Sequence, residues 1–210
     1  MIKLKDLLKL NRIKYSDEVK PKHQKKIDMQ TELITNEMRV PAKPFPENSS
    51  KETMDELNWL LNYNNGRINE EMVKEGDDII EVFENYCNQH DLKFNKSYYK
   101  KILDESSKTI LSLKYYYNRP RPYQLAEYYE IEKFKDFDLP SMKTPSYPSG
   151  HSTQGHLMAE LLGKKYFSHY NNFKKLAEFV SHSRLMARAH YPSDCIFGEE
   201  VAQHILGKIK

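Results

Sequence analysis

Apolar residues recur at the spacing of an amphipathic helix along most of this chain. The helices predicted from this spacing cover 2–10, 69–89, 96–117, 124–134, 151–167, 172–189 and 193–208. Ser49 followed by Glu52 is a capping-box pattern, which predicts a further helix to about Tyr63. No stretch alternates apolar and polar residues between hairpin turns, as a strand would. The pattern predicts an all-α fold, a single-domain helical bundle.

The first part of the chain differs from the rest in its proline and lysine content. The stretch PAKPFPENSS contains three prolines and predicts an extended segment after the first helix. Residues 1–26 hold nine Lys or Arg against three acidic residues, a surplus of about six positive charges in a chain of net charge +3. We therefore separate a basic helix with a proline-containing arm, residues 1–48, from a main domain, residues 49–210. A basic arm can bind nucleic acid or an acidic membrane surface, but lysines so widely spaced are more typical of a solvated helix face, so nucleic acid is the less favoured partner.

Composition narrows the class of protein. With 39% hydrophobic and 30% charged residues in 210, the chain has the composition of a soluble globular protein. No apolar run approaches the roughly 18 to 20 residues of a membrane span. The first residues lack the pattern of a secretory signal, so we expect a cytoplasmic protein, or a periplasmic one if a signal has been removed. Cys87 and Cys195 have no disulfide or metal-ligand spacing and are expected to be reduced core residues.

Three short segments carry side chains suited to phosphate, and the first is KYYYNRPRP. Lys114 and Arg121 are seven residues apart, roughly 10 Å along a continuous helix. Pro120 and Pro122 end the helix and redirect Arg121, so both cations can converge on one anion. Taken alone, two ordinary surface charges are the simpler interpretation.

The second segment, PSGH, stands where a helix is predicted to begin. The Ser149 hydroxyl, the Gly150 N–H and the positive end of the helix dipole suit an anion. His151 follows at the rim, where it could give a proton to an oxygen that leaves the bound anion. The alternative is that Ser149 is only a helix cap and His151 a solvent-facing residue.

The third segment, SRLMARAHYPSD, places Asp194 four residues after His190. A carboxylate at this distance can accept a hydrogen bond from one imidazole nitrogen and leave the other as a base or nucleophile. Arg184 adds a planar guanidinium that binds phosphate oxygens in pairs. Without the arginine, a capping or surface contact would be the more common role of such a pair.

Together the three segments resemble the signature of the type 2 phosphatidic acid phosphatase (PAP2) superfamily. That superfamily includes bacterial class A non-specific acid phosphatases, lipid phosphate phosphatases and vanadium-dependent haloperoxidases. Its pattern is Lys, six residues, Arg-Pro; then Pro-Ser-Gly-His; then Ser-Arg, five residues, His, three residues, Asp. In this chain the pattern is met by Lys114, Arg121, Pro122, Pro148, Ser149, Gly150, His151, Ser183, Arg184, His190 and Asp194. The resemblance covers about residues 114 to 194 and implies the all-α bundle of that superfamily.

The resemblance implies a role for each matched residue. Phosphate oxygens would be held by Lys114, Arg121, Ser149, Gly150 and Arg184. His190 would attack phosphorus to give a phosphohistidine while Asp194 orients its ring. His151 would protonate the leaving oxygen and then activate water. These roles need no metal and no cofactor, and vanadate is expected to act as an inhibitor or phosphate mimic.

Among members of the superfamily, the size of the chain and the tyrosine before Pro148 resemble the class A acid phosphatases most, although Ser152 stands where those enzymes usually have threonine. A small soluble phosphomonoester, for instance a nucleotide, is the expected substrate. The alternatives are a lipid phosphate or diphosphate phosphatase, a vanadium-dependent haloperoxidase, and a non-catalytic phosphate-binding or nucleic-acid-binding module. Transfer of phosphate to an alcohol and assembly as a homo-oligomer also stay open. Tyr123, Tyr147 and Tyr191 are candidates for a stacking wall or for packing, and His156 and His182 are expected to be structural or exposed.

Overall fold

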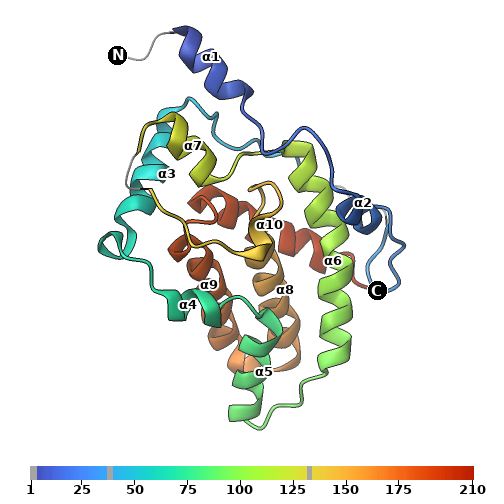
Figure 1. Cartoon of the computed structure of the whole chain (residues 1–210). Helices are drawn as coiled ribbons and strands as arrows, with labels where there is room; N and C mark the ends of the chain where they lie inside the picture. Colours follow the sequence, from blue (N-terminus) through green and yellow to red (C-terminus); the bar gives the residue numbers. More distant parts are fainter. Residues whose placement is uncertain (1–3, 37–39, 132–133) are drawn as a thin grey trace.

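Helices α8 (Gly150–Lys165), α9 (Tyr170–Met186) and α10 (Pro192–Leu206) pack together at the centre of the molecule. The computed structural model describes residues 4–36, 40–131 and 134–210 (Figure 1). The long helix α6 (Lys96–Tyr117) lies along one side of this centre, and α5 (Ile79–Gln89) contacts α6, α8 and α9. Within the described ranges there is no β-strand, only an isolated bridge between Ile34 and Ile209. The prediction of an all-α bundle is confirmed.

The remaining helices are short and lie around this centre. They are α1 (Leu4–Arg12), α2 (Pro21–Ile27), α3 (Lys51–Asn62), α4 (Glu70–Glu75), α7 (Pro122–Tyr128) and the 3-10 turns η1 (Tyr63–Gly66), η2 (Pro140–Met142) and η3 (Phe167–His169). In the part of the chain that the structure describes, no helix combines the length and apolar character that crossing a membrane requires.

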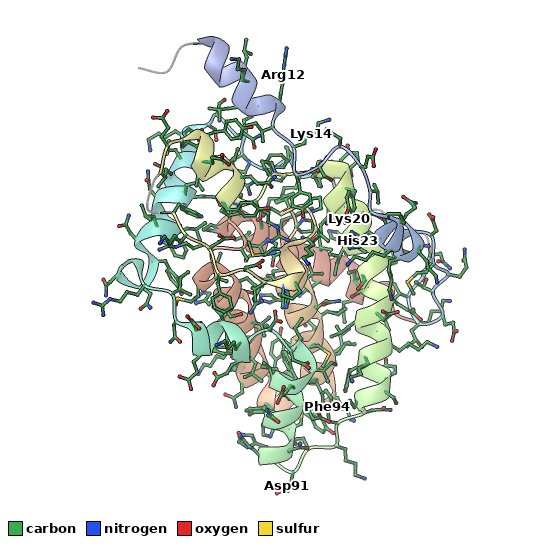
Figure 2. The ribbon with its side chains drawn as sticks, in the orientation of Figure 1. Arg12, Lys14, Lys20, His23, Asp91 and Phe94 are labelled. Carbon is green, nitrogen blue, oxygen red and sulfur yellow. The ribbon has the colours of Figure 1, made fainter. Side chains whose placement is uncertain are left out.

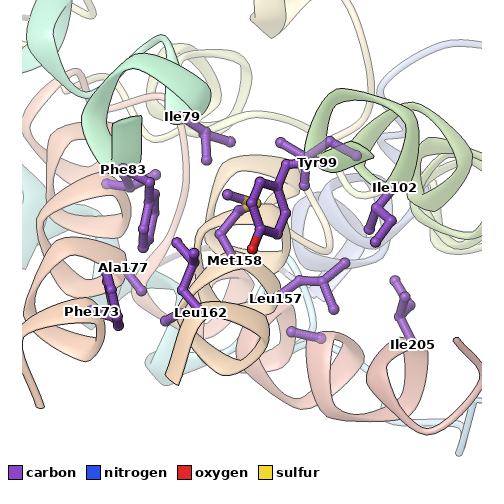
Figure 3. Packing of buried hydrophobic residues seen from close by; sticks show 14 of the residues in the cluster. Ile79, Phe83, Tyr99, Ile102, Leu157, Met158, Leu162, Phe173, Ala177 and Ile205 are labelled. Carbon is purple, nitrogen blue, oxygen red and sulfur yellow. The ribbon is translucent and has the colours of Figure 1, made fainter. Parts of the chain in front are cut away.

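The main core lies between α5, α6, α8, α9 and α10 (Figure 3). Leu157, Met158 and Leu162 of α8 are fully buried, and they belong to one cluster with Phe83 of α5 and Phe173 of α9. Burying each such side chain stabilises the fold by about 1.5–3 kcal/mol. Because α8 is covered on several faces, its polar first turn can be held rigidly at one end of the core.

The helix predicted over 69–89 is wrong in one respect, since the chain breaks there into α4 and α5. Asn69 and Asp78 each accept a hydrogen bond from a backbone N–H three residues ahead, so each caps a separate helix. Gly76 ends α4, and a Cβ at this position would lie 2.2 Å from Ser183 Oγ, so the turn can approach α9 only with glycine. The break exposes Asp77 at the turn, close to the third segment of the signature.

Other helix boundaries also differ from the prediction by one to several residues. Ser50, not Ser49, caps α3, because its hydroxyl accepts from the N–H of Thr53 at 3.1 Å. The helix predicted over 124–134 begins earlier, at Pro122, and ends at Tyr128, and residues 132–133 lie outside the described residues. The first helix runs to Arg12, with residues 2 and 3 of its predicted span also outside the described part, and α2 was not predicted.

Helix α10 approaches α8 closely at Gly198, directly beside the second segment of the signature. A Cβ at Gly198 would lie 2.8 Å from the carbonyl oxygen of Ser149 and 3.0 Å from Ser152 Cβ. We expect Gly198→Ala to lower the free energy of unfolding by about 1–3 kcal/mol, because the backbone oxygen cannot move aside without shifting α8. Gly207→Ala at the end of the same helix is the matched control, since its nearest neighbour would be 3.7 Å away. Urea denaturation of both variants measures the difference, and equal stabilities would contradict the close packing.

Candidate active site

A cavity of about 250 Å³ brings residues of all three sequence segments together. The predicted residues that line it are Lys114 and Arg121 from the first segment, Gly150 and His151 from the second, and His190 from the third. Ser149, Arg184 and Asp194 do not line it and are completely buried. The structure therefore gathers the candidate residues at one place and separates those that reach the cavity from those that support its wall.

His190 and Asp194 lie on the two sides of the start of α10. Asp194 is in the first turn, where its Oδ2 accepts the backbone N–H of Tyr191 at 3.0 Å and so caps the helix. The same oxygen accepts a hydrogen bond from His190 Nδ1 at 3.1 Å. Because a carboxylate can only accept, Nδ1 carries the proton and Nε2 holds a free electron pair. The pair thus acts as a helix cap and as an orienting contact for the imidazole.

The turn before α10 carries His190 to the cavity. Arg188 has a left-handed backbone with φ 54°, which reverses the chain after α9. Its guanidinium donates to the carbonyls of Leu61, Gly66 and Lys135, so this strained turn is tied to two other loops. Arg188 belongs to the third sequence segment, SRLMARAHYPSD, and in the structure it anchors this turn.

Arg119 is a residue that sequence reasoning missed. Its side chain is fully buried, and its Nη1 donates to Asp194 Oδ1 at 2.6 Å. Its Nη2 donates to Glu56 of α3 at 2.9 Å, and Glu56 also accepts the backbone N–H of Ser193 at 2.6 Å. The signal was present in the sequence as the first of two Arg-Pro pairs, Arg119-Pro120 before Arg121-Pro122. Arg119 is the cation that neutralises the buried Asp194.

The electrostatic environment keeps Asp194 charged and His190 neutral. Burial alone would raise the pKa of Asp194, but the charge of Arg119 and the hydrogen bond from His190 hold it well below its usual range. Burial, together with the charge of Arg121, lowers the pKa of His190 well below its ordinary value despite the contact with Asp194. A neutral imidazole with a free Nε2 is the nucleophilic form of histidine.

Arg121 and Lys114 form the cationic floor of the cavity. Arg121 Nη1 lies 3.0 Å from His190 Nε2 and also donates to the Ala189 carbonyl at 2.6 Å, while its Nε donates to the Thr144 carbonyl at 2.9 Å. Lys114 Nζ donates to the carbonyl of Pro145 at 2.6 Å. Burial lowers the pKa of Arg121 to about 10 and, with Arg121 nearby, brings that of Lys114 well below its usual value. An anion bound here would favour the charged form of both residues.

The second segment forms the rim of the cavity with the first turn of α8. Ser149 caps this helix, its hydroxyl accepting from the N–H of Ser152 at 3.3 Å, which was the simpler of the two interpretations of that residue. Its phosphate-binding role stays a prediction. Gly150 lines the cavity, and a Cβ at this position would lie 3.5 Å from Ile110 and 3.9 Å from the Lys114 side chain. A side chain here would therefore occupy part of the cavity next to Lys114, whereas glycine leaves that volume available to a ligand.

His151 is held by Asp77, a second residue that sequence reasoning missed. Its Nε2 lies 3.1 Å from the Asp77 carbonyl and 3.3 Å from the Asp77 carboxylate. The same carboxylate accepts from Arg184 Nη1 at 2.5 Å. The hydrogen bond from His151 and the charge of Arg184 lower the pKa of Asp77 to about 2, so it is ionised. Only the break between α4 and α5 brings Asp77 here, and the sequence pattern had predicted a continuous helix.

The pKa of His151 is set by two opposing effects. Burial lowers it from the ordinary value, and the hydrogen bond to Asp77 raises it part of the way back. Arg184 adds a further lowering effect, as it is fully buried and bonded to Asp77 and to the Val73 carbonyl. His151 is consequently mostly neutral at pH 7 and gains its proton under acidic conditions, because its pKa lies below the ordinary value.

The other residues considered from the sequence do not line the cavity. Tyr147 and Tyr191 are buried, the first stacked on Phe197 at 4.6 Å and the second against the Arg119 guanidinium at 3.8 Å, so they are packing residues. Tyr123 is partly exposed, His156 is buried and His182 is exposed. Both cysteines are free and buried, as predicted. Among the described residues, no group of three or more His, Cys, Asp or Glu side chains is arranged to hold a metal ion.

Comparison with known proteins agrees with the geometry. Residues 102–203 match the family model described as PAP2 superfamily. The matched range contains all three segments and every predicted site residue, and the match supports the PAP2 superfamily and, at that level, the hydrolysis of phosphate esters. No curated protein matched the chain. Asp77, Glu56 and the whole N-terminal segment lie outside the matched range.

Arg119 should be essential for stability because it neutralises a buried charge. Arg119→Met leaves Asp194 without its counter-charge, and we expect the free energy of unfolding to fall by about 3–5 kcal/mol in urea denaturation. Arg67→Met, at an exposed arginine, should change it by less than about 0.5 kcal/mol. In the double variant with Asp194→Asn the loss should be smaller than the sum of the two single losses, and simple additivity would show that the two side chains are not coupled.

Proposed function

We propose that this protein is a metal-independent phosphomonoesterase, similar to acid phosphatases, that acts through a phosphohistidine on a small soluble substrate. The observation that carries the proposal is the state of His190. Its Nδ1–H is bonded to an ionised carboxylate, its ring is neutral, and its Nε2 lies against Arg121 in a cavity lined by cations. A protein that only binds phosphate would have no use for an oriented, neutral imidazole.

The reaction follows from these positions. A phosphate ester replaces Nε2 as the partner of Arg121, and its nonbridging oxygens contact Lys114 and the Gly150 N–H. His190 Nε2 forms a bond to phosphorus while the bond from phosphorus to the leaving oxygen breaks, and protonated His151 gives its proton to that oxygen. Cations on the nonbridging oxygens stabilise the transition state, which is the main contribution in phosphoryl transfer.

The second half of the reaction releases phosphate. Neutral His151 takes a proton from water as the water oxygen attacks phosphorus, and the bond from phosphorus to Nε2 breaks. Arg184 acts through Asp77, whose carboxylate it shares with His151. The cavity volume of about 250 Å³ suits a small leaving group.

Release of phosphate from an aryl phosphate in excess EDTA tests the proposal. We expect turnover between about pH 5 and 7 that vanadate blocks, and its complete absence would overturn the proposal. His190→Ala should abolish labelling of the protein by phosphate. His151→Ala should still form some phosphoenzyme but release it slowly, by about 10²-fold or more. Equal labelling of the wild type and His190→Ala would assign the nucleophile elsewhere.

Acidic pH should favour the reaction, because the two histidines have different environments. His190 keeps its free electron pair at acidic pH, as its pKa is well below the ordinary value, whereas His151 must be protonated to act as the acid. As the pH rises, the proton on His151 is lost and kcat/KM should fall.

Asp77→Asn tests the origin of this pH dependence. The variant removes the charge that raises the pKa of His151, so the falling limb of kcat/KM should move to lower pH. Asp78→Asn is the matched control, because Asp78 is exposed and asparagine caps α5 equally well. If the falling limb of kcat/KM moves in neither variant, or equally in both, the charge of Asp77 does not set the pKa of His151.

A further inference from the structure

The N-terminal segment 15–28 lies against the loops that surround the active-site cavity. Tyr15 donates its hydroxyl to the Met142 carbonyl at 3.0 Å, and Asn118 donates to the Ser16 carbonyl at 2.6 Å. Lys20 donates to the Lys143 carbonyl at 3.2 Å. Since these bonds cross about 100 residues or more of sequence, the segment is held at this place and is not a free basic arm.

Helix α2 within this segment packs on α6 at the edge of the cavity. Figure 2 shows Lys20 and His23 beside α6. His23 is buried, with its Nδ1 2.6 Å from the Tyr115 hydroxyl, and Lys26 forms an ion pair with Asp104. His23 and Lys26 line the same cavity as Lys114, Arg121 and the two catalytic histidines. The cavity therefore has a second pair of basic side chains at its outer end.

The lining residues Ser107, Ile110 and Leu111 lie on α6 between Asp104, the partner of Lys26, and Lys114. None of these three side chains carries a charge, and the scissile phosphate is already matched by the inner cations. A neutral leaving group would need no further positive charge. Lys26 can turn toward a ligand at little cost, because both members of its ion pair are about half exposed and such pairs contribute only about 0–1 kcal/mol.

The charges around His23 point to an anion as well. Burial lowers its pKa, and the positive charges of Lys22, Lys20 and Lys114 lower it further. An anion at the outer end of the cavity would reverse this effect, since it favours protonation of His23. His23 can then donate to the anion together with Lys26.

We propose that His23 and Lys26 form an outer anion subsite, and that the preferred substrates are phosphomonoesters whose leaving group carries a second anionic group, phosphate or carboxylate. The subsite rests on the proposed function for its inner half, because it selects among substrates of the same cavity. It is built by a segment outside the range 102–203 that matches the PAP2 superfamily. Substrate choice in this protein thus depends on residues that the signature does not contain.

Binding measurements test the subsite without turnover. In a His190→Ala background, calorimetry should give a Kd for inorganic pyrophosphate that is lower than the Kd for inorganic phosphate by about tenfold or more. Lys26→Gln should bring this ratio to within about threefold and leave the Kd for phosphate within about twofold. Lys25→Gln removes the same charge from an exposed position of α2 and should leave the ratio unchanged. Equal effects of Lys25→Gln and Lys26→Gln, or no effect of either, would overturn the subsite.

Turnover with paired substrates tests the same subsite in the active enzyme. For wild type, kcat/KM should be about tenfold higher for 3-phosphoglycerate than for glycerol 3-phosphate. His23→Gln and Lys26→Gln should remove this preference and leave turnover of phenyl phosphate within about twofold. Lys26→Gln alone decides the question if the buried His23 does not tolerate change.

The outcomes separate the subsite from the proposed function. Turnover of phenyl phosphate without any preference for a second anion would overturn the subsite and leave the phosphomonoesterase intact. A pyrophosphate preference that depends on Lys26, found together with no hydrolysis of any substrate, would overturn the proposed function and leave the outer anion site intact.

Discussion

Asp194 is a charged carboxylate in the interior of the protein, and the arrangement of the active site depends on how that charge is held. Taking one carboxylate out of water costs several kcal/mol unless opposite charge and hydrogen bonds offset it. Arg119 supplies the charge, and Ser146, the Tyr191 N–H and His190 supply the hydrogen bonds. These partners come from three separate loops, at Arg119, at Ser146 and at His190–Tyr191, so the need to satisfy one carboxylate brings the segments of the site together.

A second cluster is held together in the same way, around the carboxylate of Asp77, which is partly exposed. Asp77 satisfies both Arg184 and His151, and in doing so it ties the turn between α4 and α5 to α8 and α9. Burial and the charge of Arg121 lower the pKa of His190 well below its ordinary value, whereas the hydrogen bond to Asp77 offsets part of the lowering that burial causes in His151. Two histidines of the same intrinsic pKa thereby differ in the direction that the proposed roles of nucleophile and acid require.

The N-terminal segment also contributes residues to the cavity. Its basic residues suggested a solvated face or a nucleic-acid contact, yet Lys20 and Lys26 bond to parts of the same chain and His23 is buried against α6. The number of Lys and Arg residues in a segment does not show which part of the folded protein the segment lies against. In this protein the segment runs along the edge of the cavity, where His23 and Lys26 form the outer anion subsite that we propose.

The sequence by itself determined the helical class, most helix boundaries and the eleven signature positions, because helical spacing and short fixed motifs are local properties of the chain. The helix 96–117 is found with the predicted bounds, and the three segments meet in one cavity. Tertiary structure alone decided the roles of Arg119, Asp77 and Glu56. The ion pairs of these residues join positions that are far apart in the sequence, so the spacing of residues along the chain could not predict them. Tertiary structure also decided that α4 and α5 are separate helices: apolar spacing continues through Gly76, but the packing of that glycine against Ser183 and the caps at Asn69 and Asp78 favour a turn.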